Sequence, residues 1–211
     1  MQHEYAVLGG LNRANVGRWV MGTSVALAAA VSALAGLIVA LVVDFGFEVP
    51  RLLLWPVTAG SIYLLLYAVF DRWIWRIPQL SRWLRVPDLS GSWICQGQSL
   101  HASDGRPLVT WEGEIEIAQS WDKIQIRLRT RQSVSKSLSA ALLYDSTDGY
   151  RVLYNYRNEP GIGESGLNAH RGCAELLFHS DLTAATGEYF NGHGRYTYGT
   201  LTLTRKETKA P

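Results

Sequence analysis

The chain has 211 residues, 47% of them hydrophobic, and a formal net charge of +2. This length accommodates one or two domains, and a mean hydropathy near zero averages two unlike parts. Residues 1–87 carry a formal charge of +3 and residues 88–211 a charge of −1. The second part therefore lacks the basic surface with which proteins bind duplex nucleic acid.

The first half of the chain contains two uncharged apolar runs. Residues 1–19 form a short segment with two glycines at 9–10, which we interpret as a cytoplasmic lead-in. Residues 20–43 would form a helix about 36 Å long, which predicts a first transmembrane helix. This run far exceeds the core of a signal peptide, which has about 7–15 residues. After a loop at 44–51, residues 52–70 are long enough to predict a second span.

Small residues recur at every fourth position of the first predicted span. Small side chains let another helix approach closely, which is how helices associate in lipid. The face is expected to pack on the second span, on a neighbouring chain, or on both. The predicted oligomerisation residues are Ser24, Ala28, Ser32, Gly36 and Ala40.

Arginines flank the two predicted spans on one side of the membrane. Arg13 and Arg18 precede the first span, and four arginines within 71–87 follow the second. The positive-inside rule then places both termini in the cytoplasm and the loop at 44–51 on the other, periplasmic side. Residues 71–87 also alternate arginine with tryptophan, a composition typical of the headgroup layer, and predict an interfacial linker.

Residues 88–211 change to the period of two that is typical of half-buried strands. Short connections and the lack of any helical pattern predict an all-β, antiparallel up-and-down barrel of about eight strands, with a sandwich as the alternative. A barrel of this size is wide enough to hold one small ligand. The predicted strands are 91–98, 111–117, 121–130, 133–144, 150–158, 172–179, 185–191 and 195–205.

Several of these strands carry polar or aromatic side chains at alternate positions. If these faces point inward, hydroxyls, rings and amides line a cavity that holds a polar ligand or water, because buried hydroxyls without partners cost about 1–3 kcal/mol each. Otherwise the serines face solvent and the tyrosines fill a core. Aromatic rings stack on bases, and Ser and Arg donate to phosphate oxygens. The candidate ligand contacts are Trp93, Arg131, Ser133, Ser135, Ser137, Tyr154, Tyr156, Asn158, His170, Tyr189, Asn191 and Arg195.

The sequence shows no pattern of catalytic residues. The histidines are scattered, and G-x-S-x-G, Walker A and H-E-x-x-H patterns are absent from the sequence. Cys95 and Cys173 have no metal-ligand spacing and are expected to be reduced thiols. We therefore predict a protein that is not an enzyme and that has no catalytic residue, metal or cofactor.

Four short motifs follow the two predicted spans: PDLSGSW at 87–93, YNYRNEP at 154–160, HRG at 170–172 and GEY at 187–189. In this order, and with Arg195 and Gly199 after them, they resemble the two-transmembrane, β-barrel effectors of bacterial CBASS anti-phage systems. The resemblance implies a cytoplasmic barrel that binds a cyclic dinucleotide made by a partner CD-NTase. It also implies homo-oligomerisation in the inner membrane, disruption of membrane lipid and abortive infection.

Two other functions remain open on the sequence alone. A membrane-tethered carrier of a lipid or other small apolar ligand would have a cavity lined by Leu, Ile and Phe. A structural anchor would have a filled barrel and an exposed apolar patch that docks another protein.

Overall fold

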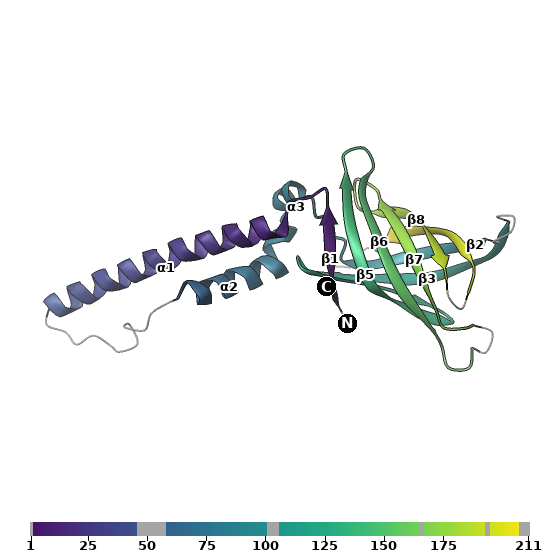
Figure 1. Ribbon diagram of the computed structural model, residues 1–211, viewed down its shortest axis with the longest axis horizontal. Helices are drawn as coiled ribbons and strands as arrows, with labels where there is room; N and C mark the ends of the chain where they lie inside the picture. Colours follow the sequence, from purple (N-terminus) through teal and green to yellow (C-terminus); the bar gives the residue numbers. More distant parts are fainter. Residues whose placement is uncertain (1, 46–57, 101–105, 165–166, 193–194, 207–211) are drawn as a thin grey trace. The chain divides into compact units, whose positions relative to one another are not determined.

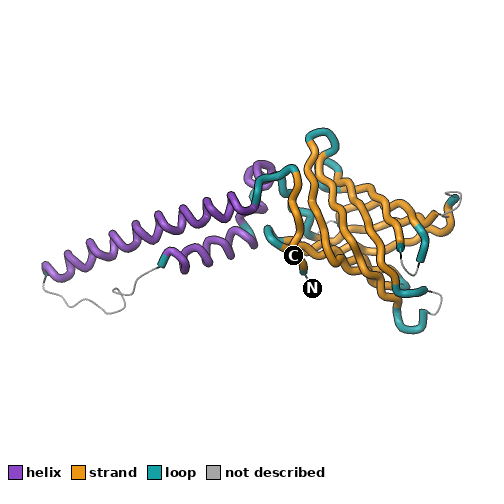
Figure 2. Tube along the Cα trace, in the orientation of Figure 1, coloured by secondary structure: helices purple, strands orange, loops and turns teal. Residues whose placement is uncertain are grey.

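The computed structural model describes residues 2–45, 58–100, 106–164, 167–192 and 195–206. The chain forms two compact units, one of residues Leu11–Trp75 and one that combines Met1–Gly10 with Arg76–Pro211. The first unit is helical and the second consists mainly of strands (Figures 1 and 2). The elements are β1 (His3–Leu8), α1 (Arg13–Asp44), α2 (Ala59–Arg72), the 3₁₀ helix η2 (Ile74–Arg76), α3 (Pro78–Leu84), β2 (Gly91–Leu100), β3 (Pro107–Gln119), β4 (Lys123–Thr130), β5 (Ser133–Asp145), β6 (Gly149–Pro160), β7 (His170–Phe178), β8 (Ala184–Asn191) and β9 (Tyr198–Arg205).

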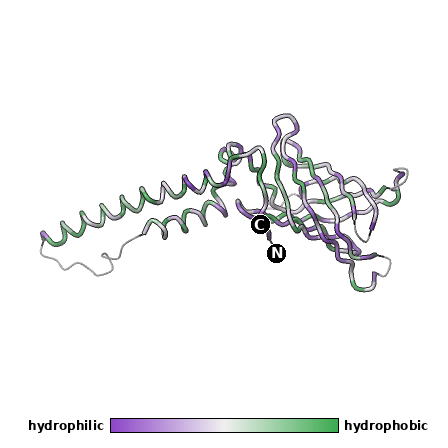
Figure 3. Tube along the Cα trace, in the orientation of Figure 1, coloured by the Kyte–Doolittle hydropathy of each residue, from purple (hydrophilic) through white to green (hydrophobic). Residues whose placement is uncertain are grey.

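Helix α1 is capped at its N-terminus by Asn12, whose side chain accepts a hydrogen bond from the Ala14 amide at 2.8 Å. This cap satisfies one of the free amides of the first turn. Apolar residues dominate the helix (Figure 3), and among the described residues it is the one helix long and apolar enough to cross a membrane. It packs against α2. Ser24 and Ala28 are buried, whereas Ser32, Gly36 and Ala40 are exposed.

Helix α2 covers only part of the second predicted span. It has 14 residues, is capped by the Thr58 side chain and is about 21 Å long. The structure therefore shows one long helix rather than the clear two-helix hairpin that we expected. Residues 52–57 of the predicted span, and 46–51 of the predicted loop, lie outside the described residues.

The predicted interfacial linker is only partly available to a membrane surface. Trp73 and Trp83 are exposed, but Trp75 is fully buried. Arg76 donates to the Gln119 carbonyl at 2.5 Å. Arg85 donates to the Gly9 carbonyl at 2.9 Å. Two of the linker's arginines thus bind within the barrel unit.

The nine strands form a sheet that closes into a barrel in the order β1-β4-β3-β2-β9-β8-β7-β6-β5. Strands β2 to β9 follow the predicted up-and-down antiparallel order. The prediction of about eight strands did not include β1, which lies between β4 and β5 beyond the short ladder that joins these two strands directly. Strand β1 pairs antiparallel with β4 at His3 and Glu4, and then parallel with β5 from Tyr5↔Ala140 to Leu8↔Leu143. The parallel pairing also departs from the all-antiparallel expectation.

A buried polar cluster fixes β1 in the barrel wall. The Tyr5 hydroxyl donates to the Ser120 carbonyl at 3.3 Å and accepts from Gln119 Nε2 at 3.2 Å. Gln119 also donates to the Pro87 carbonyl and accepts from the Leu89 amide. One side chain therefore joins the N-terminal strand to the segment that leads into β2.

The barrel interior changes in character along its axis. One end is a packed apolar core, in which each fully buried large side chain stabilises the fold by about 1.5–3 kcal/mol. At the other end, inward positions carry polar residues, such as Ser133 and Ser135 on β5 and Asn158 on β6. The large, fully buried core residues of the barrel include Leu89, Trp93, Ile115, Trp121, Ile124, Ile126, Leu142, Leu176, Phe178 and Leu203.

Candidate ligand-binding site

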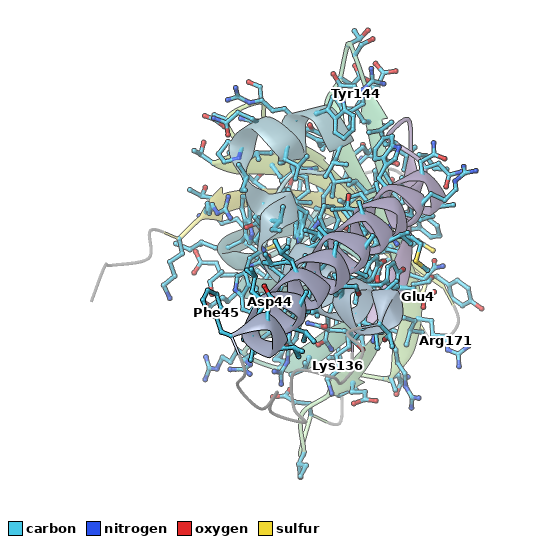
Figure 4. All side chains as sticks on the ribbon, turned by 90° about the vertical axis from the view of Figure 1, so that its left-hand side faces the viewer. Glu4, Asp44, Phe45, Lys136, Tyr144 and Arg171 are labelled. Atoms are coloured by element: carbon cyan, nitrogen blue, oxygen red, sulfur yellow. The ribbon has the colours of Figure 1, made fainter. Side chains whose placement is uncertain are left out.

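The polar end of the barrel encloses a cavity of about 1160 Å³. Ligand pockets typically measure about 300–1,000 Å³, so this one accommodates one sizeable small molecule. Its wall includes residues of β2, β3, β6, β7, β8 and β9, the β4–β5 turn and the β6–β7 connection. Lys136 and Arg171, which are next in sequence to the inward Ser135 and His170, are exposed on the outer wall of the barrel (Figure 4).

Asn158 organises one side of the cavity. It lies opposite Ser135 in the β5–β6 ladder, and its Nδ2 donates to Ser133 Oγ at 2.9 Å and Ser135 Oγ at 2.8 Å. Its Oδ1 is buried and has no hydrogen-bond partner among the described residues. The serine hydroxyls are thus held in fixed positions by an amide rather than directed to solvent.

Two groups of aromatic rings line the wall. Trp111 and Tyr189 meet edge to face with centroids 6.0 Å apart, and Ser99 Oγ and the Tyr189 hydroxyl are 2.7 Å apart. On β6, Tyr154 and Tyr156 have centroids 6.0 Å apart. Burial raises the pKa of both β6 tyrosines above the usual value. Their hydroxyls are therefore neutral donors, and Tyr156 donates to Asn191 Oδ1 at 2.6 Å.

The cavity wall carries charges of both signs. Arg131, Arg195, Glu112 and Glu164 all belong to the lining. Burial, followed by the charge of Arg195, lowers the pKa of His170, although a hydrogen bond to the Asn168 carbonyl opposes the shift. The imidazole is therefore neutral near pH 7. Its Nδ1 lies 2.8 Å from that carbonyl, so Nδ1 carries the proton and Nε2 is an acceptor.

Aromatic and arginine side chains alternate around the cavity. Following the strand order, Trp111 lies on β3, Arg195 in the connection between β9 and β8, three tyrosines on β8 and β6 (Tyr189, then Tyr154 and Tyr156), and Arg131 in the turn between β4 and β5. In the closed sheet, β3 and β6 are on opposite sides, and so are the two arginine-bearing connections.

Two family models match the chain. Residues 84–205 match "Cap15, cyclic dinucleotide receptor domain" and residues 14–76 match "Cap15, TM helices". CD-NTase-associated protein 15 of Yersinia aleksiciae is 42% identical over 212 residues, which cover 97% of this chain and 98% of that protein. The chain belongs to the Cap15 family. The resemblance to CBASS effectors is confirmed, and the whole cavity lining lies within the Cap15 receptor-domain match.

Most of the residues predicted to contact a ligand do line the cavity of this Cap15 receptor domain. Trp93 and Ser137 do not. Trp93 is fully buried in the apolar core, donates to the Leu89 carbonyl at 3.2 Å and meets the Phe178 ring edge to face. Ser137 Oγ accepts from the Ile126 amide at 2.9 Å. The predicted ligand contacts that line the cavity are Arg131, Ser133, Ser135, Tyr154, Tyr156, Asn158, His170, Tyr189, Asn191 and Arg195.

Sequence reasoning missed part of the lining. Trp111 was not among the predicted ligand contacts, although an indole at the start of the predicted strand 111–117 was a usable signal. Ser99, Gln96 and Gln98 had no distinctive pattern in β2.

Among the described residues of this Cap15 chain, no group of three His, Cys, Asp or Glu side chains is placed to hold a metal ion. Burial raises the pKa of the Cys95 thiol to about 12.

Proposed function

We propose that the barrel cavity binds one cyclic dinucleotide, and that binding triggers assembly of the membrane helices with those of other copies. The activating ligand would be the product of a partner CD-NTase, as the name of the Yersinia relative suggests. Assembly would disrupt the bacterial inner membrane and kill the infected cell. On this proposal the protein acts by binding and assembly, without catalysis.

The alternation of rings and arginines around the cavity carries this proposal. A cyclic dinucleotide alternates base, phosphate, base and phosphate around its own ring. Bases stack on aromatic faces, and arginine is well matched to phosphate oxygens. Trp111 and the β6 tyrosines would take the two bases, while Arg131 and Arg195 would take the two phosphates. The amide and hydroxyl groups beside them would supply contacts to base edges and ribose.

The lining disfavours the alternative of a lipid carrier. Such a cavity should be lined by Leu, Ile and Phe, but most side chains of this wall are polar or tyrosine. An extended acyl chain would leave Asn158 Oδ1, which is buried without a hydrogen-bond partner among the described residues, facing hydrocarbon at a cost of about 1–3 kcal/mol.

The small-residue face of α1 provides the assembly surface in this proposal. Ser24 and Ala28 are already buried within the chain, whereas Ser32, Gly36 and Ala40 remain exposed. A Cβ added at Gly36 would meet no described atom within 4 Å. A second copy could therefore approach α1 closely at this level of the helix.

The membrane topology is also part of the proposal. Residues 20–43 and 52–70 would both span the inner membrane, with the loop at 44–51 periplasmic. Residues 1–19, the linker at 71–87 and the barrel at 88–211 would be cytoplasmic, because the flanking arginines lie on that side. Trp73 and Trp83, the exposed indoles of the linker, would contact the headgroup layer.

Calorimetry on the full-length protein in detergent tests the ligand. A panel of cyclic dinucleotides with purine and pyrimidine bases should include one that binds with one site per chain, whereas the linear dinucleotide of the same bases should bind more weakly. The absence of binding by every member, with a folded barrel by circular dichroism, would refute the proposal. Binding of co-purified lipid, seen by native mass spectrometry, would favour the carrier instead.

A further inference from the structure

Three glycines inside the barrel lie directly opposite three cavity-lining aromatic residues. Gly97 on β2 pairs with Trp111 on β3, and Gly172 on β7 pairs with Tyr156 on β6. Gly199 on β9 pairs with Tyr189 on β8. The repeated arrangement places one residue without a side chain beside each ring.

Each ring occupies the space that a side chain on its partner glycine would need. A Cβ on Gly97 would overlap the Trp111 indole. A Cβ on Gly172 would lie 2.6 Å from Tyr156 Cζ, and one on Gly199 would lie 2.8 Å from Tyr189 Cε1. Real Cβ atoms do not approach so closely, so each ring lies across its glycine and against the barrel wall.

We propose that Gly97 is a positioning residue that determines ligand affinity by holding the Trp111 indole flat against β2. One indole face then covers the glycine backbone, and the other is left toward the cavity as a stacking surface for a base. Tyr156 and Tyr189 likewise occupy the space beside Gly172 and Gly199. If the indole projected inward instead, it would fill part of the lumen. This inference rests on the proposed function, since the stacked group is a base of the cyclic dinucleotide.

The other contacts of the indole support a fixed orientation. Its Nε1 donates to the Tyr189 hydroxyl at 3.4 Å, and the two rings meet edge to face at an interplanar angle of 68°. Tyr189 is in turn fixed by Ser99. A ring that is held in place before binding loses little conformational entropy when a base stacks on it.

Gly97 is also the cleanest of the three positions to change. The three nearest atoms to its added Cβ all belong to the Trp111 side chain. At Gly172 and Gly199, an added Cβ would also crowd a backbone carbonyl, that of Phe190 or of Gln98. An effect of Gly97→Ala can therefore be assigned to displacement of the indole.

The test is a double-mutant cycle on the full-length protein, with affinity for the best-binding cyclic dinucleotide measured by calorimetry. Because stacking on one ring contributes about 1–3 kcal/mol, Gly97→Ala and Trp111→Ala should each weaken binding roughly 5- to 100-fold. If Gly97 acts through the indole, Gly97→Ala in the Trp111→Ala background should cause no further loss. Additive losses, or wild-type affinity in Gly97→Ala, would overturn the inference.

Trp111→Leu and Trp111→Phe keep the test decisive if Gly97→Ala fails to fold. Leucine fills space without an aromatic face and should weaken binding, whereas phenylalanine should retain most of the affinity. Equal affinities of these two variants would contradict the stacking role. If the wild-type protein binds no cyclic dinucleotide, the proposed function itself fails. If the wild-type protein binds and only the expected effects of the variants are missing, the role of Gly97 fails while the proposed function stands.

Discussion

The N-terminal strand should contribute measurably to the stability of the barrel, and Tyr5 is the residue at which to test this. Its side chain is 4% exposed. Tyr5→Phe removes the hydroxyl contacts, which include those to Ser120 and Gln119, and should lower the free energy of unfolding by about 0.5–1.5 kcal/mol. Tyr5→Ala also removes a buried ring and should lower it by about 3–5 kcal/mol.

Thermal unfolding of the full-length protein in detergent, followed by near-UV circular dichroism, is the assay. For a protein of this size, 1 kcal/mol shifts Tm by about 2–4 °C, so Tyr5→Ala should melt about 6–20 °C below the wild type. Leu8→Ala is the matched control, because Leu8 lies on the same strand but is 53% exposed, and its Tm should change by less than about 2 °C. Equal melting temperatures for Tyr5→Ala and Leu8→Ala would refute the assignment of β1 to the barrel.

Three further predictions concern the proposed function. Gly36→Leu should abolish killing when the ligand is produced in cells, while leaving ligand affinity unchanged. The control Ala30→Leu, which lies about 120° around the helix, should still kill. Killing by both variants would exclude a role of the small-residue face in assembly. Arg195→Gln should weaken binding about tenfold or more. The control Arg129→Gln, at an exposed position outside the cavity, should leave binding unchanged. Equal effects of the two variants would mean that Arg195 acts through long-range charge and not through a direct contact with phosphate. Because burial keeps His170 neutral in the free protein and a bound phosphate would raise its pKa, binding should take up a proton. Affinity should then rise, by up to about tenfold per pH unit, as pH falls from the higher pKa of the bound state toward the lowered pKa of the free imidazole, and an unchanged slope in His170→Asn would refute this.

Much of the barrel follows from alternation in the sequence. The eight strands of the C-terminal part lie close to their predicted positions because hydrophobic side chains at every second residue identify both a strand and its buried face. Strand β1 was missed because its six residues end at two glycines and its partner strand β5 is more than a hundred residues away. Only the Tyr5 side chain is buried in β1, so periodicity offered no signal.

The sequence predicted which side chains of a strand share a face, but not how far along the barrel axis each one lies. Alternation placed Ser133, Ser135 and Ser137 on the same side of β5, yet Ser137 lies deeper and bonds to the Ile126 amide and to His3 Nε2. A register shift after Ser137 turns Ser139 outward, which a strict period of two does not foresee. Trp93 and Trp111 are both inward, but only the height along the barrel axis decides which one reaches the cavity. That height depends on strand pairing rather than on local sequence.

The Arg85 contact with Gly9 has a consequence for how such receptors are divided and recombined. In linear order, the membrane helices are an insertion between the first strand of the sheet and the remaining eight, and Arg85 joins the two ends of that insertion at 2.9 Å. The receptor is thus a discontinuous domain. A fragment that begins at residue 88 would keep the short β4–β5 ladder from Arg127↔Lys136 to Arg129↔Val134 but would lose the pairing of β1 with β4 and β5 beyond it. A chimaera that receives this sensor intact must therefore also receive the first ten residues.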